Sequence, residues 1–188
     1  MYCIYMNMNI ELVPYKNNNK SHIEKYHISN SDNLILKYKI CNVFAPFGRQ
    51  YLHQTTQKLN QHRLNVCFSK KEVEEYNESY EELKKIISEL ETFFYDFDEL
   101  KGYELISNII DRDSYGKVIR FHLKTLKNNT TSSLIQIIDS VSQKVEWIQF
   151  QQDKQFNFDF SPDCFWIDHT NKKYGVSLVI INAFQFIS

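Results

Sequence analysis

The C-terminal part of the chain consists of two apolar segments on either side of a short polar turn. Cys164–His169 contains three large apolar side chains, and Tyr174–Ile187 is apolar over most of its length. The turn between them contains Lys172 and Lys173. Two segments of this kind, joined by a few polar residues, are typical of an antiparallel hairpin. We therefore expect the chain to end in the closing hairpin of a small β-barrel.

Short segments in which apolar and polar residues alternate recur along the rest of the chain. In Lys117–Leu126, every second residue is apolar at Ile119, Phe121 and Leu123. Alternate side chains of a strand point to opposite faces of its sheet, so this pattern predicts a half-buried strand. Similar patterns predict further strands at Ile10–Val13, Leu34–Val43, Arg63–Phe68, Tyr103–Ile110, Ser133–Ile138 and Val145–Phe150. Many short strands indicate a mainly β fold, and we expect an OB-type β-barrel.

One segment has a helical rather than a β pattern. Ser69-Lys70-Lys71-Glu72 matches a capping box, in which the Ser and Glu side chains accept hydrogen bonds from amides at a helix start. Apolar residues then recur every three or four positions over residues 73–97, while the opposite face is rich in Glu. We expect one long amphipathic helix over about 70–99, inserted between the early and late strands. Its apolar stripe would pack on its own domain or form a self-association seam, and the sequence leaves both open.

Length and composition favour a single folded domain with an N-terminal extension. The chain has 188 residues with only 4 Gly and 3 Pro, which argues against a disordered protein. Residues 1–32 are polar and rich in Asn, and we expect a partly ordered N-terminal arm there. Residues 33–188 would form one OB-like barrel domain that includes the helix over 70–99. The frequent residues Asn, Lys, Ile and Tyr have codons rich in A and T, which points to an AT-rich genome such as that of a large DNA virus, a plasmid or a parasite.

Cysteine usage and hydropathy favour a cytoplasmic protein without a structural metal. The four cysteines, Cys3, Cys41, Cys67 and Cys164, are scattered and form no C-x-x-C pair. Disulfide frameworks and zinc sites show tighter spacing, so we expect free thiols in a reducing compartment. No apolar run reaches the ~18 residues of a membrane-spanning helix. We expect no membrane association and no cofactor.

Charge is distributed unevenly along the chain. The formal net charge is only −1, but residues 71–99 contain 11 of the 23 acids and three of the 22 bases, a local net charge of −8. The remaining residues carry 19 bases and 12 acids, a net charge of +7. Such segregation permits a basic face on a nearly neutral protein. It would equally result from an acidic helix that is simply solvated.

One predicted strand places three basic side chains on the same face. Arg120, His122 and Lys124 alternate with its apolar residues, at a spacing of about 7 Å that suits contacts with a phosphodiester backbone. Lys37 and Lys39 repeat this pattern on an earlier strand. The predicted phosphate-binding set also includes Arg49, Lys172 and Lys173. The alternative is an ordinary solvated face of a half-buried strand.

Aromatic side chains supply the second part of the predicted interface. Proteins that bind single strands stack bases on exposed rings, and such stacking tolerates any sequence. Phe47, Trp147 and Trp166 lie near predicted strand ends or turns, and we expect bases to stack on them. For each ring, packing in the core is the alternative.

No catalytic signature is visible in the sequence. The chain lacks G-x-S-x-G, H-E-x-x-H and G-x-x-x-x-G-K-[S/T], and we expect no enzymatic activity. Asp111, Asp113 and His122 would suit a metal-dependent nuclease or hydrolase only with a further carboxylate that the sequence does not place nearby. A hairpin turn is the simpler interpretation of Asp111–Gly116.

Several segments in the second half of the chain resemble a known family. The stretch Gly116–Lys124, the Ile138-Asp139-Ser140 turn, Phe165-Trp166 and the strand Tyr174–Ile187 resemble the OB-fold single-stranded DNA-binding proteins of tailed phages and large DNA viruses. They also resemble replication proteins of cytoplasmic linear plasmids in yeasts. The resemblance implies a closed barrel whose basic strand faces DNA, with replication proteins as partners. The phage proteins recruit those partners with an acidic tail, whereas the acids of this chain cluster in the predicted helix.

Together, these observations predict a sequence-tolerant single-stranded DNA-binding protein that acts in DNA replication without catalysis. Stacking and phosphate contacts do not separate DNA from RNA, so RNA is an alternative ligand. A homo-oligomer is compatible with the apolar stripe. The competing hypothesis is a structural or assembly protein that self-associates through the stripe at 73–97 and has no nucleic-acid role.

Overall fold

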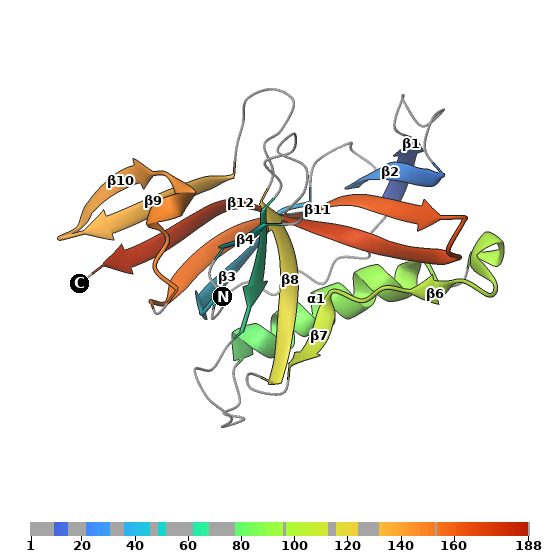
Figure 1. Ribbon diagram of the computed structural model, residues 1–188, viewed down its shortest axis with the longest axis horizontal. Helices are drawn as coiled ribbons and strands as arrows, with labels where there is room; N and C mark the ends of the chain where they lie inside the picture. The colour runs from blue at the N-terminus through green and yellow to red at the C-terminus, as the bar shows by residue number, and fades with distance from the viewer. Residues whose placement is uncertain are drawn as a thin grey trace.

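The structure, a computed structural model, is built on one 12-stranded β-sheet with α1 on one side (Figure 1). The residues that it describes are 10–14, 22–30, 36–45, 49–51, 62–67, 78–95, 97–112, 116–123, 132–152 and 154–187. The first elements are β1 (Ile10–Pro14), β2 (Ile23–Asn30), β3 (Tyr38–Val43), β4 (Arg49–Tyr51), β5 (His62–Val66) and α1 (Glu78–Phe93). They are followed by η2 (Asp98–Leu100), β6 (Glu104–Leu105), β7 (Ile109–Arg112), β8 (Gly116–Leu123), β9 (Ser133–Ile138), β10 (Val141–Val145), η3 (Trp147–Gln149), β11 (Phe156–Asp168) and β12 (Lys173–Ile187). The predicted mainly β fold is confirmed.

The predicted C-terminal hairpin is the centre of the sheet. β11 and β12 are 13 and 15 residues long and pair along almost their whole length. Bulges between Asp159 and Phe160 and between Pro162 and Cys164 interrupt the register and bend the pair. Because the strands are so long, different neighbours pair with different parts of them. β2 pairs with the C-terminal half of β11, and β3 pairs with its N-terminal half.

The sheet does not close into a barrel. Its main path runs β1-β2-β11-β12-β8-β5-β4, and among the described residues the end strands β1 and β4 do not pair with each other. β9 and β10 extend the C-terminal end of β12 away from α1 (Figure 1). The expected OB-type barrel is therefore not confirmed. A closed barrel needs continuous pairing back to its first strand, whereas here the flanking strands attach at opposite ends of one long hairpin.

Part of the predicted N-terminal arm belongs to the sheet. β1 and β2 form an antiparallel hairpin. Although the two segments are far apart in sequence, Ile23–His27 of β2 pair with Cys164–Asp168 of β11. The expected strand at Ile10–Val13 is confirmed as β1, and β2 is a further strand that the polar sequence did not predict.

The helix ends earlier than predicted. α1 begins at Glu78 in the described part of the chain, and residues 68–77, which include the whole capping box, lie outside that part. At the other end α1 stops at Phe93, where the chain tightens into a turn in which the Tyr95 N–H donates to the Thr92 carbonyl. The apolar spacing continues past this turn, which is why it suggested a longer helix. No helix within the described ranges has the length and apolar content needed to span a membrane.

The apolar stripe of α1 packs on one face of the sheet, which we call the inner face; the opposite face is the outer face. Leu83, Ile87, Leu90 and Phe94 are 0–1% exposed and belong to the main hydrophobic core. The ring of Phe94 stacks on Phe165 of β11, with centroids 3.9 Å apart and an interplanar angle of 8°. The stripe thus packs on its own domain in this structure. A dimer seam through the same residues would first have to expose them.

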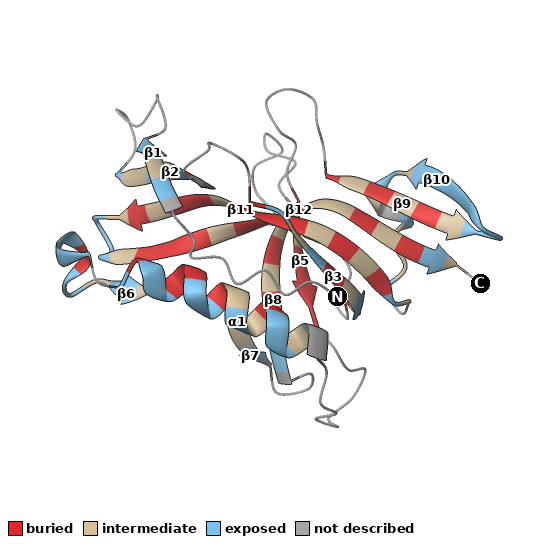
Figure 2. Ribbon diagram, turned by 180° about the vertical axis from the view of Figure 1, so that it is seen from behind, coloured by how far each residue is buried: buried red, intermediate tan, exposed pale blue. Residues whose placement is uncertain are grey.

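Aromatic side chains of β8 and β11 fill the core at the inner face. Phe121, Phe158 and Phe160 are fully buried. The Phe121 ring meets the other two edge to face, at centroid distances of 4.9 and 5.2 Å. Ile119 and Leu123 are buried in the same cluster, so the predicted alternation of β8 is confirmed. The buried band through β8, β11 and β12 is visible from behind in Figure 2.

A buried carboxylate fixes the end of α1 to the sheet. Glu91 is 6% exposed, and its Oε1 accepts the backbone N–H of Asn108 at 2.8 Å. The Ser107 hydroxyl donates to Oε2 of Glu91 at 2.9 Å. The Asn108 side chain then donates to the Val176 carbonyl of β12 at 2.8 Å. A buried carboxylate is tolerated here because both of its oxygens accept hydrogen bonds.

The segment predicted as a strand at Val145–Phe150 has a different structure. Val141–Val145 forms β10, which makes a hairpin with β9, and Trp147–Gln149 forms the 3-10 helix η3. A capping box starts η3: the Glu146 side chain accepts the Gln149 N–H, and Gln149 Oε1 accepts the Glu146 N–H at 3.0 Å. These two bonds stabilise a helical turn where the alternation of apolar residues suggested a strand.

Candidate nucleic-acid interface

The outer face of the sheet carries basic side chains on two adjacent strands. β5 and β8 are antiparallel partners, with Arg63 opposite His122 and Asn65 opposite Arg120. Because Phe121 points to the inner face, its neighbours Arg120 and His122 point to the outer face. Directly opposite residues in an antiparallel pair have Cβ atoms about 5 Å apart, and diagonal neighbours lie about 7–8 Å apart. We call Arg63, Arg120 and His122 the basic cluster.

The basic cluster is half-buried rather than fully solvated. All three side chains have intermediate exposure, and the Nε atoms of both arginines are buried. Among the residues that the structure describes, Arg63 has no ion pair, and its Nε has no hydrogen-bond partner. A guanidinium in this situation favours an incoming anion, because its planar N–H groups bind phosphate oxygens in pairs. The alternative, an ordinary solvated face of a half-buried strand, stays open.

Two of the predicted lysines lie on the β3 side of the outer face. Lys39 of β3 is opposite Asp159 of β11. Lys37, just before β3, forms an ion pair with the Asp159 carboxylate at 3.2 Å, and Asn182 of β12 donates to the same carboxylate at 3.2 Å. Both lysines are exposed. They are therefore accessible to a ligand, although Asp159 offsets one of their two charges.

The other two predicted lysines lie far from the basic cluster. Lys172 is in the turn of the β11–β12 hairpin, and Lys173 begins β12. His122 of the basic cluster is paired with Val179, six residues further along β12, which corresponds to about 20 Å in an extended strand. Lys173 Nζ also lies 3.4 Å from the Glu104 carboxylate. The structure does not bring these lysines into one site with Arg120 and His122.

Carboxylates balance the positive charge near this turn. The side chain of Asn171 donates to Asp168 at 2.8 Å, and this bond is the main cause that lowers the pKa of Asp168. The Tyr26 hydroxyl donates to Glu24 at 2.7 Å, which lowers the pKa of Glu24 and raises the pKa of Tyr26 to about 12. Both carboxyl groups stay ionised at neutral pH. The turn is therefore less suited to phosphate than the basic cluster.

Both predicted stacking tryptophans are half-buried and held against the protein. Trp147 Nε1 donates to the Ser132 carbonyl at 2.7 Å, and its ring packs on Phe150 at a centroid distance of 5.8 Å. Trp166 lies on β11 opposite Gly175 of β12, and its indole covers that glycine. Stacking of bases on either ring stays a prediction.

Gly175→Ala is expected to destabilise the protein by about 1–3 kcal/mol, the usual range for overpacking. A β-carbon at Gly175 would lie 2.9 Å from Cζ2 of Trp166 and 3.0 Å from the Ile106 carbonyl oxygen. Neither a half-buried indole nor a backbone carbonyl moves away easily. Chemical denaturation measures the loss of stability. Combining the change with Trp166→Phe should recover part of it; no recovery would assign the clash to the Ile106 backbone instead.

Three predicted contacts lack a described side chain. Phe47 and Lys124 lie outside the described residues. Arg49 begins β4 and is opposite Leu64 of β5, but its side chain is not described. These three residues stay predictions. Arg49 is nevertheless on the strand next to the one that carries Arg63.

The described residues give no geometric support to the alternative of a metal site. Asp113 lies outside the described residues. Asp111 is exposed on β7, opposite Lys117 of β8. Within the described ranges, no three His, Cys, Asp or Glu side chains are grouped so that they could hold a metal ion.

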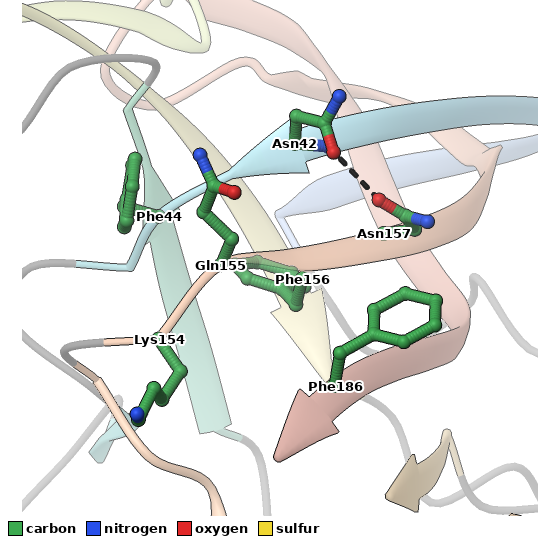
Figure 3. A pocket seen from close by; sticks show the side chains of 7 residues that line it. All are labelled: Asn42, Phe44, Lys154, Gln155, Phe156, Asn157 and Phe186. Carbon is green, nitrogen blue, oxygen red and sulfur yellow. Dashed lines mark hydrogen bonds between the residues drawn. The ribbon is translucent and has the colours of Figure 1, made fainter. Parts of the chain in front are cut away.

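The structure contains a pocket on the outer face that the sequence analysis did not predict (Figure 3). Its volume is about 560 Å³. Asn157 and Phe186 point to the outer face, because they alternate with the buried Phe156, Phe158 and Gln185. The pocket is lined by Asn42, Phe44, Lys154, Gln155, Phe156, Asn157 and Phe186.

The sequence contains little signal for Arg63 and Phe186, two residues of the candidate site that it did not predict. Arg63 is a single charge in a short strand, and only its register opposite His122 connects it to the basic cluster. Phe184 and Phe186 alternate with Gln185 in the closing strand, a pattern that predicts buried rings and an exposed amide. The structure has the reverse, with Gln185 fully buried and Phe186 exposed, so this alternation gave no signal for an exposed ring.

No protein-family model matches this chain, and no curated protein matches it. The basic cluster and the pocket therefore carry the functional argument.

Proposed function

We propose that this protein binds single-stranded DNA without strong sequence preference, in DNA replication, and has no catalytic role. The observation that carries the proposal is the basic cluster, in which two arginines and a histidine share the outer face of β5 and β8. Lys37 and Lys39 add positive charge to the same face on the β3 side. Cations spread over neighbouring strands suit a chain of phosphates better than one small anion.

The acidic helix lies on the other side of the sheet from these cations. α1 packs on the inner face, and its exposed carboxylates include Glu81, Glu82 and Glu89. The sheet separates them from the outer face, so they cancel little of the positive potential there. An anionic strand is then attracted to the outer face and repelled by the exposed side of α1.

The geometry of the arginines favours a flexible strand over a duplex. Their Nε atoms are buried, so a phosphate must approach the sheet closely to contact both guanidinium groups. A single strand can bend to do so, whereas a duplex is stiff over tens of base pairs. Phosphate contacts carry no sequence information, so binding by this face would tolerate any sequence.

Arg63→Gln combined with Arg120→Gln is expected to weaken binding to a labelled single strand and to flatten its salt dependence. Each neutralised phosphate contributes about 0.7 to the slope of log affinity against log salt for single strands, so two lost contacts should reduce the slope by about 1.4. Gln keeps much of the Arg side chain's packing while removing its charge. Fluorescence anisotropy over a series of salt concentrations measures both quantities.

Lys84→Gln with Lys85→Gln is the matched control. It removes the same charge from α1, where Lys84 pairs with Glu81 and Lys85 with Glu89. The slope should not change in this variant. Equal losses in the two double variants would show that only net charge matters. A wild-type protein that binds no single strand at low salt, or binds duplex equally well, would contradict the proposal; tighter binding to RNA would assign the face to RNA.

A further inference from the structure

The outer-face pocket combines aromatic rings with amide side chains. Phe44 and Phe186 lie on opposite sides of it, with Gln155 between them (Figure 3). Phe186 is 54% exposed, in contrast to the buried phenylalanines of the core. An aromatic ring exposed beside a cavity has a flat apolar face to offer to a planar ligand. The volume of about 560 Å³ is in the usual range of small-ligand pockets.

A bulge in the β3–β11 pairing shapes the polar side of the pocket. The register shifts between Phe156 and Phe158, so that β3 has one extra residue there. Asn42, in this bulge, has a left-handed φ of 58°, a conformation that Asn adopts more readily than most non-glycine residues. Its N–H donates to Asn157 Oδ1 at 2.9 Å, which orients the Asn157 amide.

Two amide groups keep hydrogen-bonding capacity in this pocket. Among the residues that the structure describes, the Nδ2 of Asn157 and the side-chain amide of Gln155 have no hydrogen-bond partner. An Asn or Gln amide offers donors and an acceptor side by side, as the edge of a nucleobase requires. Proteins read unpaired bases by stacking on rings and by hydrogen bonds to base edges. Lys154 adds a cation at the rim, where a phosphate would follow the base.

We propose that this pocket holds one base of the bound strand, stacked on Phe186 with its edge bonded by Gln155 and Asn157. The inference rests on the proposed function and adds a base site to it. The pocket is connected to the basic cluster through β5: Phe44 and Cys67 exchange backbone hydrogen bonds of 2.8 Å. Cys67 is four residues beyond Arg63, about 13 Å along an extended strand. A single-stranded DNA a few nucleotides long can therefore occupy both the pocket and the basic cluster.

The test compares binding of two single-stranded DNA oligonucleotides of the same length and charge, one with bases and one abasic. Wild-type protein should bind the strand with bases more tightly. Phe186→Ala should weaken that binding about 5- to 150-fold, as expected for the loss of one stacked base, and leave abasic binding and the salt slope unchanged. Phe186→Tyr should restore the preference for bases. Thermal unfolding checks that each variant is folded.

Val141→Ala is the matched control, because Val141 is 66% exposed on β10 and does not line the pocket. It should bind both strands as the wild type does. If the wild type prefers bases but Phe186→Ala keeps that preference, bases stack elsewhere and the pocket proposal is wrong. Equal weakening for both strands would also overturn it. If the wild type binds neither strand, the proposed function itself fails.

Discussion

Phe121→Ala is expected to lower the free energy of unfolding by about 3–5 kcal/mol. The ring is fully buried and contacts Phe158 and Phe160 edge to face. Its removal leaves a cavity that cannot easily collapse, because β8 is held by β5 on one edge and by β7 and β12 on the other. Urea denaturation should show a lower midpoint at an unchanged slope.

Arg120→Gln tests the neighbouring position on the same strand. Arg120 points to the outer face and is half-buried, so its replacement removes a charge and little core packing. The loss of stability should be clearly smaller than for Phe121→Ala, while single-strand binding weakens. The reverse result, a stable Phe121→Ala and an unfolded Arg120→Gln, would mean that the two faces of β8 are inverted.

Local patterns predicted the elements whose geometry depends on neighbours in the chain. Ser133–Ile138 matches β9, and the alternation around Phe121 assigned the buried side of β8 correctly. Burial of one face imposes such a period on any strand, so it can be recognised in a few residues. The segment at Glu146–Gln149 shows the limit of this approach. There the capping bonds of Glu146 and Gln149 form a helical turn, although the apolar residues alternate as in a strand.

Closure of the sheet had no comparable local signal. Whether a sheet closes depends on hydrogen bonds between strands far apart in sequence, here β1 and β4. Bulges in β3, β11 and β12 also shift the register between strands, and they insert single residues without a distinctive sequence pattern. A series of short strands is therefore compatible with both an open sheet and a closed barrel.

The candidate site was predictable only in its main strand. Arg120 and His122 lie on the predicted face, but their half-burial depends on packing over the outer face that no strand pattern describes. The pocket needs three separate segments, around Asn42, Asn157 and Phe186, and a bulge that orients the first toward the second. Sites assembled in this way become visible only when the register of the sheet is known.

Leu83→Ser combined with Leu90→Ser is expected to unfold the domain. Both side chains are fully buried under the sheet. Each large-to-small change costs about 2–5 kcal/mol, and a buried hydroxyl adds to this. The two sites are seven residues apart, about 10 Å along α1, so their costs should add. The sum is comparable with the whole stability of a domain, about 5–15 kcal/mol. Far-UV circular dichroism and the loss of a cooperative unfolding transition measure this outcome.

Glu81→Lys with Glu82→Lys is the matched control on the exposed side of the same helix. Both carboxylates are solvated, and exposed ion pairs such as Glu81–Lys84 contribute little to stability, so the fold should persist. Single-strand binding should be retained and change little, because the sheet separates these carboxylates from the outer face. Sedimentation then distinguishes between the two roles considered for the apolar stripe, packing in the core of its own domain and self-association. Folded, monomeric Leu variants of a dimeric wild type would favour the assembly hypothesis, since a seam between subunits can be lost without unfolding. Unfolded Leu variants would place the stripe in the core of the domain. If the Glu variants also fold and bind DNA, the outer face remains the surface that binds single-stranded DNA.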